Sequence, residues 1–424
     1  MSDNEGKKGL SRRQILRTAG ALLAHSALAP RLGAADEPSA KNNDVLYGQS
    51  TLPPGIRSRQ IGTNTGATLH ILEAGFTAPR RPAIVLLHGF PELAYSWRHQ
   101  LLPLARAGFH VIAPDLRGYG RSVTVPVTYS DDLLPYSLLT RVSDILGLVR
   151  ALGHEKVAAV VGHDWGGPTA QWCARVRPDV FQSVVSMSTP FFHPPPLPLG
   201  ANGHETSGTQ VDVYKELAAL PRPRQHYISY SAGRGANDDM WHSPQGVHDL
   251  LRALYHFKSA DWKANKPFPL KSWTASELAR LPSYYIMDLD KGIAQTVAPA
   301  MPSKAHIAAC KWMSEEDLRV YSTEFVRTGF QGGLNYYRVI EDSGFGAELK
   351  SFSGRTIHVP ACFIGGDSDW ATYQSPGAFE EMSTVCTRLL GVHMVRGAGH
   401  SIAEEQPGEV NKVLLGFVQR VKLT

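Results

Sequence analysis

The stretch that decides the fold is "VVGHDWGGPTAQWCA", Val160 to Ala174. Its first residues end a short apolar run, "VAAVVGHD", which is typical of a strand buried on both faces. Glycines follow on both sides of Asp164, and the stretch then continues with residues that favour a helix. Strand, tight turn and helix in this order predict a nucleophile elbow, with Asp164 at the carboxyl end of the strand, where open α/β sheets bind ligands.

Further apolar runs with the same character lie on both sides of this stretch. An alternating segment with a Gly/Asn turn at residues 57–75 predicts a hairpin. Buried strands are expected in "AIVLLHGFPE" (83–92), "HVIAPDLRGYGRS" (110–122) and "VFQSVVSMST" (180–189), and a helical pattern lies between them in "YSLLTRVSDILGLVRALG" (136–153). Strands that alternate with helices predict an α/β fold with a mostly parallel sheet flanked by helices.

The alternation stops at a Pro/Gly-rich segment, "FFHPPPLPLGANGH", and the pattern is helical and rich in aromatics to about residue 355. One helix is expected to begin with Ser243 as its cap, and those after Thr274 and Ser314 have capping-box spacing. Buried-strand character returns in "HVPACFIGGDSDW" and "GVHMVRGAGH". We therefore expect a core in two parts, residues 57–192 and 356–424, with a helical cap, 193–355, inserted after the sixth strand.

The N-terminus carries most of the formal net charge of +5, because residues 1–35 contain six basic and two acidic groups. A twin arginine, Arg12-Arg13, precedes a modest apolar run, and small residues stand just before Asp36. This resembles a twin-arginine export signal cleaved after Ala35, followed by a linker at 36–56. The resemblance implies the twin-arginine translocation machinery as a partner and a periplasmic or secreted protein; the alternative is a basic amphipathic N-terminal helix.

Composition excludes several other classes of protein. Four cysteines are too few for a disulfide scaffold, and neither CxxC nor HExxH spacing supports a metal site, so we expect no metal and no cofactor. The body of the chain is nearly neutral, which gives no reason to expect a nucleic-acid partner. The cysteines are interpreted as mostly buried small apolar residues: Cys173, Cys310, Cys362 and Cys386.

An aspartate at the elbow has a specific chemical consequence. A carboxylate with a reference pKa of about 3.9 is already ionised at neutral pH and can attack a strained or activated carbon, which leaves an ester on the enzyme. Water must then cleave that ester, and this step needs a general base and a group to orient it. His400 in "GAGHS" is the expected base, and Asp369 in "GGDSDW" is its orienting acid. Asp367 competes for the acid role, but the G-x-x-D spacing from Gly366 favours Asp369, and Asp367 is interpreted as a solvated turn residue.

Ester hydrolysis also needs donors for the oxyanion. The backbone N–H groups of Trp165, directly after the nucleophile, and of Phe90 in "HGFP" are the expected donors. Pro91 is expected to fix that loop, with a cis Phe90–Pro91 bond as one means. His88 and His163 beside these positions are interpreted as structural.

Five motifs in this order, "HGFPE", "DLRGYGRS", "GHDWGG", "GGDSD" and "GAGH", resemble those of the α/β-hydrolase epoxide hydrolases over residues 57–424. The resemblance implies an α/β-hydrolase fold and conversion of an epoxide to a vicinal diol without a cofactor. In that family two cap tyrosines bind the epoxide oxygen. They correspond here to Tyr337 in "GLNYYR" and Tyr227 in "HYISY", with Tyr230 as a competitor for the second role.

Two other functions use parts of the same constellation. A haloalkane or haloacid dehalogenase uses the same set of an aspartate nucleophile, a histidine base and an orienting aspartate. A ligand-binding protein could retain the same scaffold without turnover. The cap tyrosines favour an epoxide, since the alkoxide of an opened epoxide needs a proton whereas a halide does not. A complete catalytic set argues against a simple binder.

Overall fold

The computed structural model describes residues 51–78, 80–197 and 212–422. The expected export signal at 1–35, its cleavage point after Ala35 and most of the linker at 36–56 lie outside these residues. None of the helices in the described ranges combines the length and the hydropathy that a membrane span requires.

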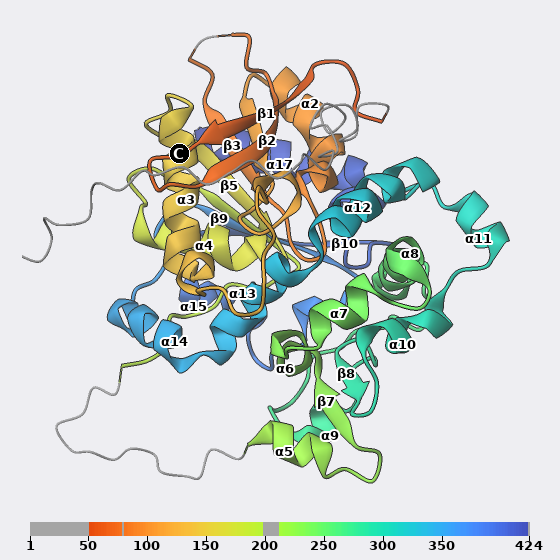
Figure 1. Ribbon diagram of the computed structural model, residues 1–424. Coiled ribbons are helices and arrows are strands. Elements are labelled where there is room, and N and C mark those ends of the chain that lie inside the picture. Colours follow the sequence, from red (N-terminus) through yellow and green to blue (C-terminus); the bar gives the residue numbers. More distant parts are fainter. Residues whose placement is uncertain (1–50, 79, 198–211, 423–424) are drawn as a thin grey trace, which may run out of the picture. The chain divides into compact units, whose positions relative to one another are not determined.

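A mostly parallel sheet forms the centre of the described part of the chain (Figure 1). Its order within these residues is β1-β2-β4-β3-β5-β6-β9-β10. The pairs β1–β2 and β2–β4 are antiparallel, and the other neighbouring pairs of this sheet are parallel. Strands β1 and β2 form the hairpin expected at the start of the core. The strands are β1 (Ile56–Gly62), β2 (Thr68–Ala74), β3 (Ala83–Leu87), β4 (His110–Pro114), β5 (Val157–His163), β6 (Val184–Met187), β9 (Ala361–Gly366) and β10 (Leu389–Val395).

Helices cover both faces of this sheet (Figure 1). On one face α3 packs on α4, which lies directly under β5 and β6. On the other face α17 packs on α2 and β10. The α/β fold predicted from the strand and helix pattern is therefore confirmed. These helices are α2 (Arg98–Arg106), α3 (Leu138–Ala151), α4 (Gly166–Val176), α15 (Met382–Val385), α16 (Ile402–Glu405) and α17 (Pro407–Lys422).

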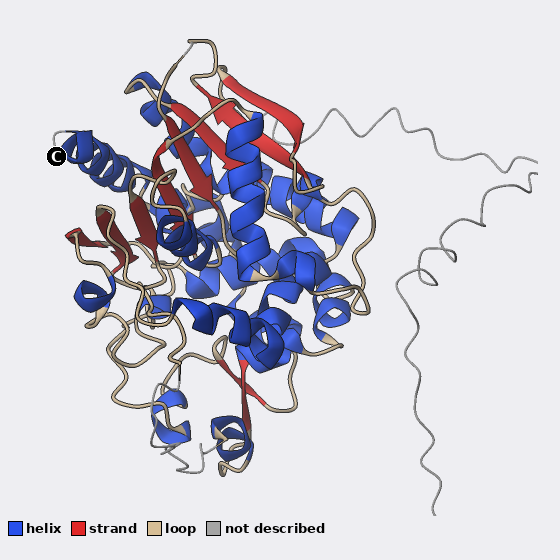
Figure 2. Cartoon of the chain, turned by 90° about the vertical axis from the view of Figure 1, so that its left-hand side faces the viewer, coloured by secondary structure: helices blue, strands red, loops and turns tan. Residues whose placement is uncertain are grey.

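The chain leaves the sheet after β6, its sixth strand, and returns to it at β9. Between them lie the described helices α5 (Val213–Ala218), α6 (Tyr227–Ala232), α7 (Ala236–Trp241), α8 (Gly246–Lys258), α9 (Ala275–Leu278), α10 (Ile293–Val297), α11 (Lys304–Ala309), α12 (Glu315–Thr328), α13 (Gln331–Glu341) and α14 (Ser343–Leu349). The insert also contains an antiparallel pair, β7 (Arg224–His226) with β8 (Ile286–Asp288), which Figure 2 shows apart from the main sheet. The helical pattern did not reveal this pair, because strands of three residues are too short to establish a period.

The helix starts in the insert differ in part from expectation. Ser314 and Asp317 form the reciprocal capping box of α12 that their spacing predicts. Thr274 is the N-cap of α9, but its side chain makes no capping hydrogen bond, and the carboxylate of Glu277 binds the N–H of Lys271 instead. The expectation that Ser243 caps α8 is wrong. That residue forms a turn with Gly246, and the helix begins at Gly246, whose φ of +75° favours glycine.

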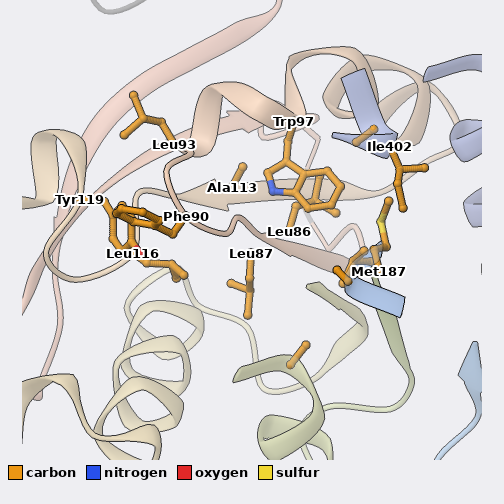
Figure 3. Packing of buried hydrophobic residues seen from close by; sticks show 14 of the residues in the cluster. Leu86, Leu87, Phe90, Leu93, Trp97, Ala113, Leu116, Tyr119, Met187 and Ile402 are labelled. Atoms are coloured by element: carbon orange, nitrogen blue, oxygen red, sulfur yellow. The ribbon is translucent and has the colours of Figure 1, made fainter. Parts of the chain in front are cut away.

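Aromatic and aliphatic side chains fill the space at the carboxyl end of β3 (Figure 3). Phe90 lies beside Tyr119 there, with ring centroids 6.4 Å apart. Direct hydrogen bonds also join the insert to the core, from the Tyr255 hydroxyl to the carbonyl of Pro91 and from the Tyr336 hydroxyl to the carbonyl of Arg117. These contacts fix the insert over the carboxyl ends of the central strands.

All four cysteines lie in the described residues and are free thiols. Three of them are buried, as expected for small apolar side chains, and Cys310 is partly buried.

Candidate active site

Asp164 stands at the sharp turn between β5 and α4. Its φ of +48° is in the left-handed region, which is uncommon for residues other than glycine. The flanking glycines permit the turn because backbone atoms pack where a side chain would otherwise stand. A Cβ on Gly162 would lie 2.0 Å from the carbonyl oxygen of Gly166, and a Cβ on Gly166 would lie 2.2 Å from the carbonyl oxygen of Leu87. The turn is a nucleophile elbow with a carboxylate at its tip.

The loop after β3 supplies a backbone donor to this carboxylate. The N–H of Phe90 donates to Asp164 Oδ1 at 2.9 Å, and the Phe90–Pro91 peptide bond is cis. Trp165, the other expected donor, is the N-cap residue of α4, so its backbone N–H lies at the positive end of that helix. Both residues assigned to the oxyanion hole thus flank the carboxylate.

His400 and Asp369 come from the loops after β10 and β9 and meet beside Asp164. His400 Nδ1 lies 3.1 Å from Asp369 Oδ1, and His400 Nε2 lies 3.4 Å from Asp164 Oδ2. Asp369 is buried, whereas Asp367 is exposed and its Oδ1 accepts the N–H of Gly397. Of the two aspartates in "GGDSD", the structure brings Asp369 to the histidine.

The electrostatics of the cluster favour its charged forms. Burial raises the pKa of Asp164, but the His400 imidazolium and the Lys258 ammonium more than offset this and hold it well below its ordinary value. Burial and Lys258 lower the pKa of His400, while Asp369 and Asp164 raise it, and the result is a pKa of about 9. At neutral pH Asp164 is therefore ionised and His400 carries a proton.

Two tyrosines of the insert face this cluster. The ring of Tyr337, on α13, packs edge-on against Trp165 at 4.9 Å and against Phe90 at 5.5 Å. Tyr227, the first residue of α6, packs against Tyr337 at 5.9 Å. Burial raises the pKa of both hydroxyls, and the negative charge of Asp164 raises each further. Both hydroxyls therefore keep their protons at neutral pH.

Tyr230, the competitor for the second role, points elsewhere. Its hydroxyl donates to Asp239 Oδ2 inside the insert, and Asp239 also accepts the N–H of Ala294. The hydroxyl of Tyr227 instead lies 3.2 Å from Gln374 Oε1, in the segment that follows Asp369. Of the two residues that the sequence left open, the geometry places Tyr227 at the site.

The two histidines interpreted as structural brace the surrounding loops. His88 accepts the N–H of Leu116 at Nε2 and bonds the carbonyl of Gly89 through Nδ1. His163 joins Glu92 Oε2 at Nδ1 and the carbonyl of His400 at Nε2. These bonds link the loop after β3, the elbow and the loop of the base into one network.

Three residues near the cluster escaped the sequence analysis: Lys258, Gln374 and Glu405. Lys258 ends α8, and its charge acts on both Asp164 and His400. Glu405 accepts the N–H groups on both sides of His400, from Gly399 at 2.8 Å and from Ser401 at 3.1 Å. No local motif marks a lysine at a helix end or a glutamine in a loop; only the fold brings them here.

This arrangement can carry out displacement at carbon followed by ester hydrolysis. It has an ionised carboxylate that can act as a nucleophile, a histidine–carboxylate pair that can activate water, and a backbone donor to one oxygen of the first carboxylate. Two tyrosines of the insert have hydroxyls that can donate to a leaving oxygen. Among the described residues no group of three or more His, Cys, Asp or Glu side chains could hold a metal ion.

Comparison with known proteins agrees with this geometry. Residues 82–226 match the family described as "alpha/beta hydrolase fold". The chain is 32% identical to Epoxide hydrolase B of Mycobacterium tuberculosis over 83% of its own length and 96% of that protein, and 30% identical to an epoxide hydrolase of Caballeronia sordidicola over 88% and 96%.

Solved structures give the same result. An epoxide hydrolase from an endophytic Streptomyces superposes with a TM-score of 0.70 at 30% identity, covering 88% of this chain and 98% of that one. Potato (Solanum tuberosum) epoxide hydrolase I superposes with a TM-score of 0.65 at 28% identity, covering 86% and 99%. Because these similarities span core and insert together, the chain belongs to the epoxide hydrolases of the α/β-hydrolase fold, which are hydrolases that act on ether bonds.

Proposed function

We propose that this enzyme converts an epoxide to a vicinal diol through a covalent ester on Asp164. The observation that carries the proposal is the packing of Tyr337 on Trp165, the residue after Asp164, and of Tyr227 on Tyr337, since paired hydroxyl donors suit an oxygen leaving group. A dehalogenase would need donors to a halide and no proton source.

In the first step Asp164 Oδ2 attacks a ring carbon of the epoxide, and the C–O bond breaks toward the oxygen. Oδ1 is the oxygen held by the N–H of Phe90 and becomes the ester carbonyl. Tyr337 and Tyr227 hydrogen-bond the epoxide oxygen and donate a proton to the alkoxide as its charge develops. The proton on His400 then replaces the one that the tyrosines gave up.

In the second step His400, now neutral and oriented by Asp369, removes a proton from water. The hydroxide attacks the ester carbonyl carbon, and the N–H groups of Phe90 and Trp165 stabilise the oxyanion. The intermediate collapses with release of the diol and restores the carboxylate of Asp164. No metal or cofactor takes part in this scheme.

A single-turnover experiment in 18O-water tests the scheme with styrene oxide, a trans-stilbene oxide and a fatty-acid epoxide as substrates. We expect label in Asp164 and unlabelled oxygen in the first diol released, because the enzyme carboxylate supplies one diol oxygen. A His400→Gln variant is expected to form the ester and not to hydrolyse it, which intact-protein mass spectrometry detects. Label appearing directly in the first diol would rule out the ester; halide release from haloalkanes with inert epoxides would indicate a dehalogenase.

We also propose that residues 1–35 direct export through the twin-arginine translocation machinery, with cleavage after Ala35 and a periplasmic or secreted mature protein. The support is the Arg12-Arg13 pair, the modest apolar run and the small residues before Asp36. The mature chain would keep every residue of the active site.

A further inference from the structure

Lys258 is a cationic side chain that the proposed reaction scheme leaves without a role. It is partly buried at the end of α8, with Nζ 5.6 Å from the ring centroid of Tyr285. That ring packs at 5.0 Å on Tyr227, one of the two cap tyrosines. Within the described residues the Lys258 ammonium makes no hydrogen bond or ion pair. Its contact with the Tyr285 ring is the one direct interaction of this partly buried ammonium that the described residues show.

The backbone at Lys258 is attached directly to the loop of the base. The N–H of His400 donates to the carbonyl of Lys258 at 2.9 Å. Glu405 Oε2 accepts the N–H of Ala260, two residues further on, at 2.9 Å, and also that of Gly399 at 2.8 Å. The segment that carries the ammonium is therefore held in register with the imidazole.

The charges around Lys258 are those of the catalytic cluster. The carboxylates of Asp164, Asp369 and Glu92 attract the ammonium, and the imidazolium of His400 is repelled by it. Burial lowers the pKa of Lys258 below its ordinary value, and the three carboxylates offset that fall only in part. Lysine and carboxylates thus stabilise each other's charge through space.

Several titratable groups face the His400 ring. The carboxylates act to keep it protonated, and the cations act to remove its proton. They are Asp164 at the elbow, Asp369 after β9, Glu92 in the loop after β3, His163 at the end of β5 with its ring centroid 4.9 Å away, and Lys258 at the end of α8. Ester formation removes the charge of Asp164 and so shifts this balance toward the cations.

We propose that Lys258 is a positioning residue whose positive charge keeps His400 in its neutral, water-activating form once the ester has formed. The inference rests on the proposed ester mechanism. In the unreacted enzyme Asp164 and Asp369 balance His400 and Lys258. After Asp164 is esterified and His400 has passed its proton toward the alkoxide, Asp369 and Lys258 balance each other, and His400 is left uncharged to accept a proton from water.

The test compares Lys258→Met with Lys258→Arg, which keeps the charge, and with Lys266→Met, which removes an equal charge from an exposed position of the insert. Alkylation and ester hydrolysis are measured separately with styrene oxide, by rapid quenching and intact-protein mass spectrometry, from pH 6 to 10. A unit charge within about 10 Å at an effective dielectric constant of about 20 shifts a neighbouring pKa by about one unit.

In Lys258→Met we expect the acidic limb of the pH–rate profile for ester hydrolysis to move up by about one pH unit. The hydrolysis rate should therefore fall by up to about tenfold on that limb and recover at high pH. Alkylation should stay within about threefold, since the pKa of Asp164 is held far below the assay range, and ester should accumulate at neutral pH. In Lys258→Arg and Lys266→Met the acidic limb of the pH–rate profile for hydrolysis should stay where it is in the unaltered enzyme.

An unshifted limb in Lys258→Met overturns the proposal. The proposal also fails if the rates of alkylation and hydrolysis fall equally, are not rescued at high pH, and are accompanied by a lower melting temperature. That pattern would indicate a structural role for Lys258. If the unaltered enzyme turns over epoxides without forming any ester, the reaction scheme itself fails, a result distinct from each of these.

Discussion

The three tyrosines Tyr337, Tyr227 and Tyr230 provide the sharpest test of the site, because two face the nucleophile and the third does not. Each is changed to phenylalanine, which keeps the ring and removes only the hydroxyl. In Tyr337→Phe the ring keeps its packing on Trp165 and Phe90, so the fold of the variant should be undisturbed. The variant Tyr230→Phe is the matched control, three residues from Tyr227 on the same helix.

The expected size follows from what each hydroxyl contacts. A hydrogen bond to a charged group contributes about 1.5–3 kcal/mol, which corresponds to a rate loss of about 10- to 100-fold for a donor acting only on the developing alkoxide. Tyr337→Phe and Tyr227→Phe should each slow alkylation by that factor, and the double variant by about 10³-fold or more. Tyr230→Phe loses its bond to Asp239, so it should lower stability by about 1–2 kcal/mol and leave alkylation within about twofold.

The assay is single-turnover alkylation of the enzyme by styrene oxide, quenched on the millisecond to second scale and quantified by intact mass. Urea unfolding of each variant separates stability from rate. The reasoning is refuted if Tyr230→Phe slows alkylation as much as Tyr227→Phe, or if the double variant alkylates at the rate of the unaltered enzyme.

The remaining predictions concern pH, backbone and export. The pKa of His400 is raised from 6.5 to about 9 in the folded state, so its stabilising contribution is complete below pH 6.5 and is lost as pH rises through 9. The free energy of unfolding measured with urea should fall by on the order of 3 kcal/mol over that window. A His400→Gln variant should not show this fall. Gly162→Ala should give little soluble protein, because its Cβ would meet the carbonyl of Gly166 at 2.0 Å, whereas Gly408→Ala, where a Cβ meets nothing within 4 Å, should express normally. Replacing Arg12 and Arg13 by lysine should leave unprocessed protein in the cytoplasm, and N-terminal sequencing of exported material that begins at Met1 rather than Asp36 would contradict the assigned signal.

Much of the core could be predicted because its signals are local. Apolar runs between helical patterns identify a parallel sheet, and glycines on both sides of Asp164 identify a turn that no bulkier residue permits. The motif order also separated His400 and Asp369 from the other histidines and aspartates of the chain. Predictions were weaker in the insert, where the start of α8 and the short pair β7–β8 were missed because three-residue strands and irregular turns have no period.

The sequence by itself therefore determined the sheet, the elbow and the chemical types of the reacting groups, since each depends on neighbours within a few residues. Only the tertiary structure decided between Tyr227 and Tyr230, because both belong to one short helix and differ only in the direction that packing gives to each ring. It alone brought Lys258 to the cluster, 142 residues before His400 in the chain yet hydrogen-bonded to its N–H. Charge acts through space, and no spacing in the sequence reveals which distant charges a fold will bring together.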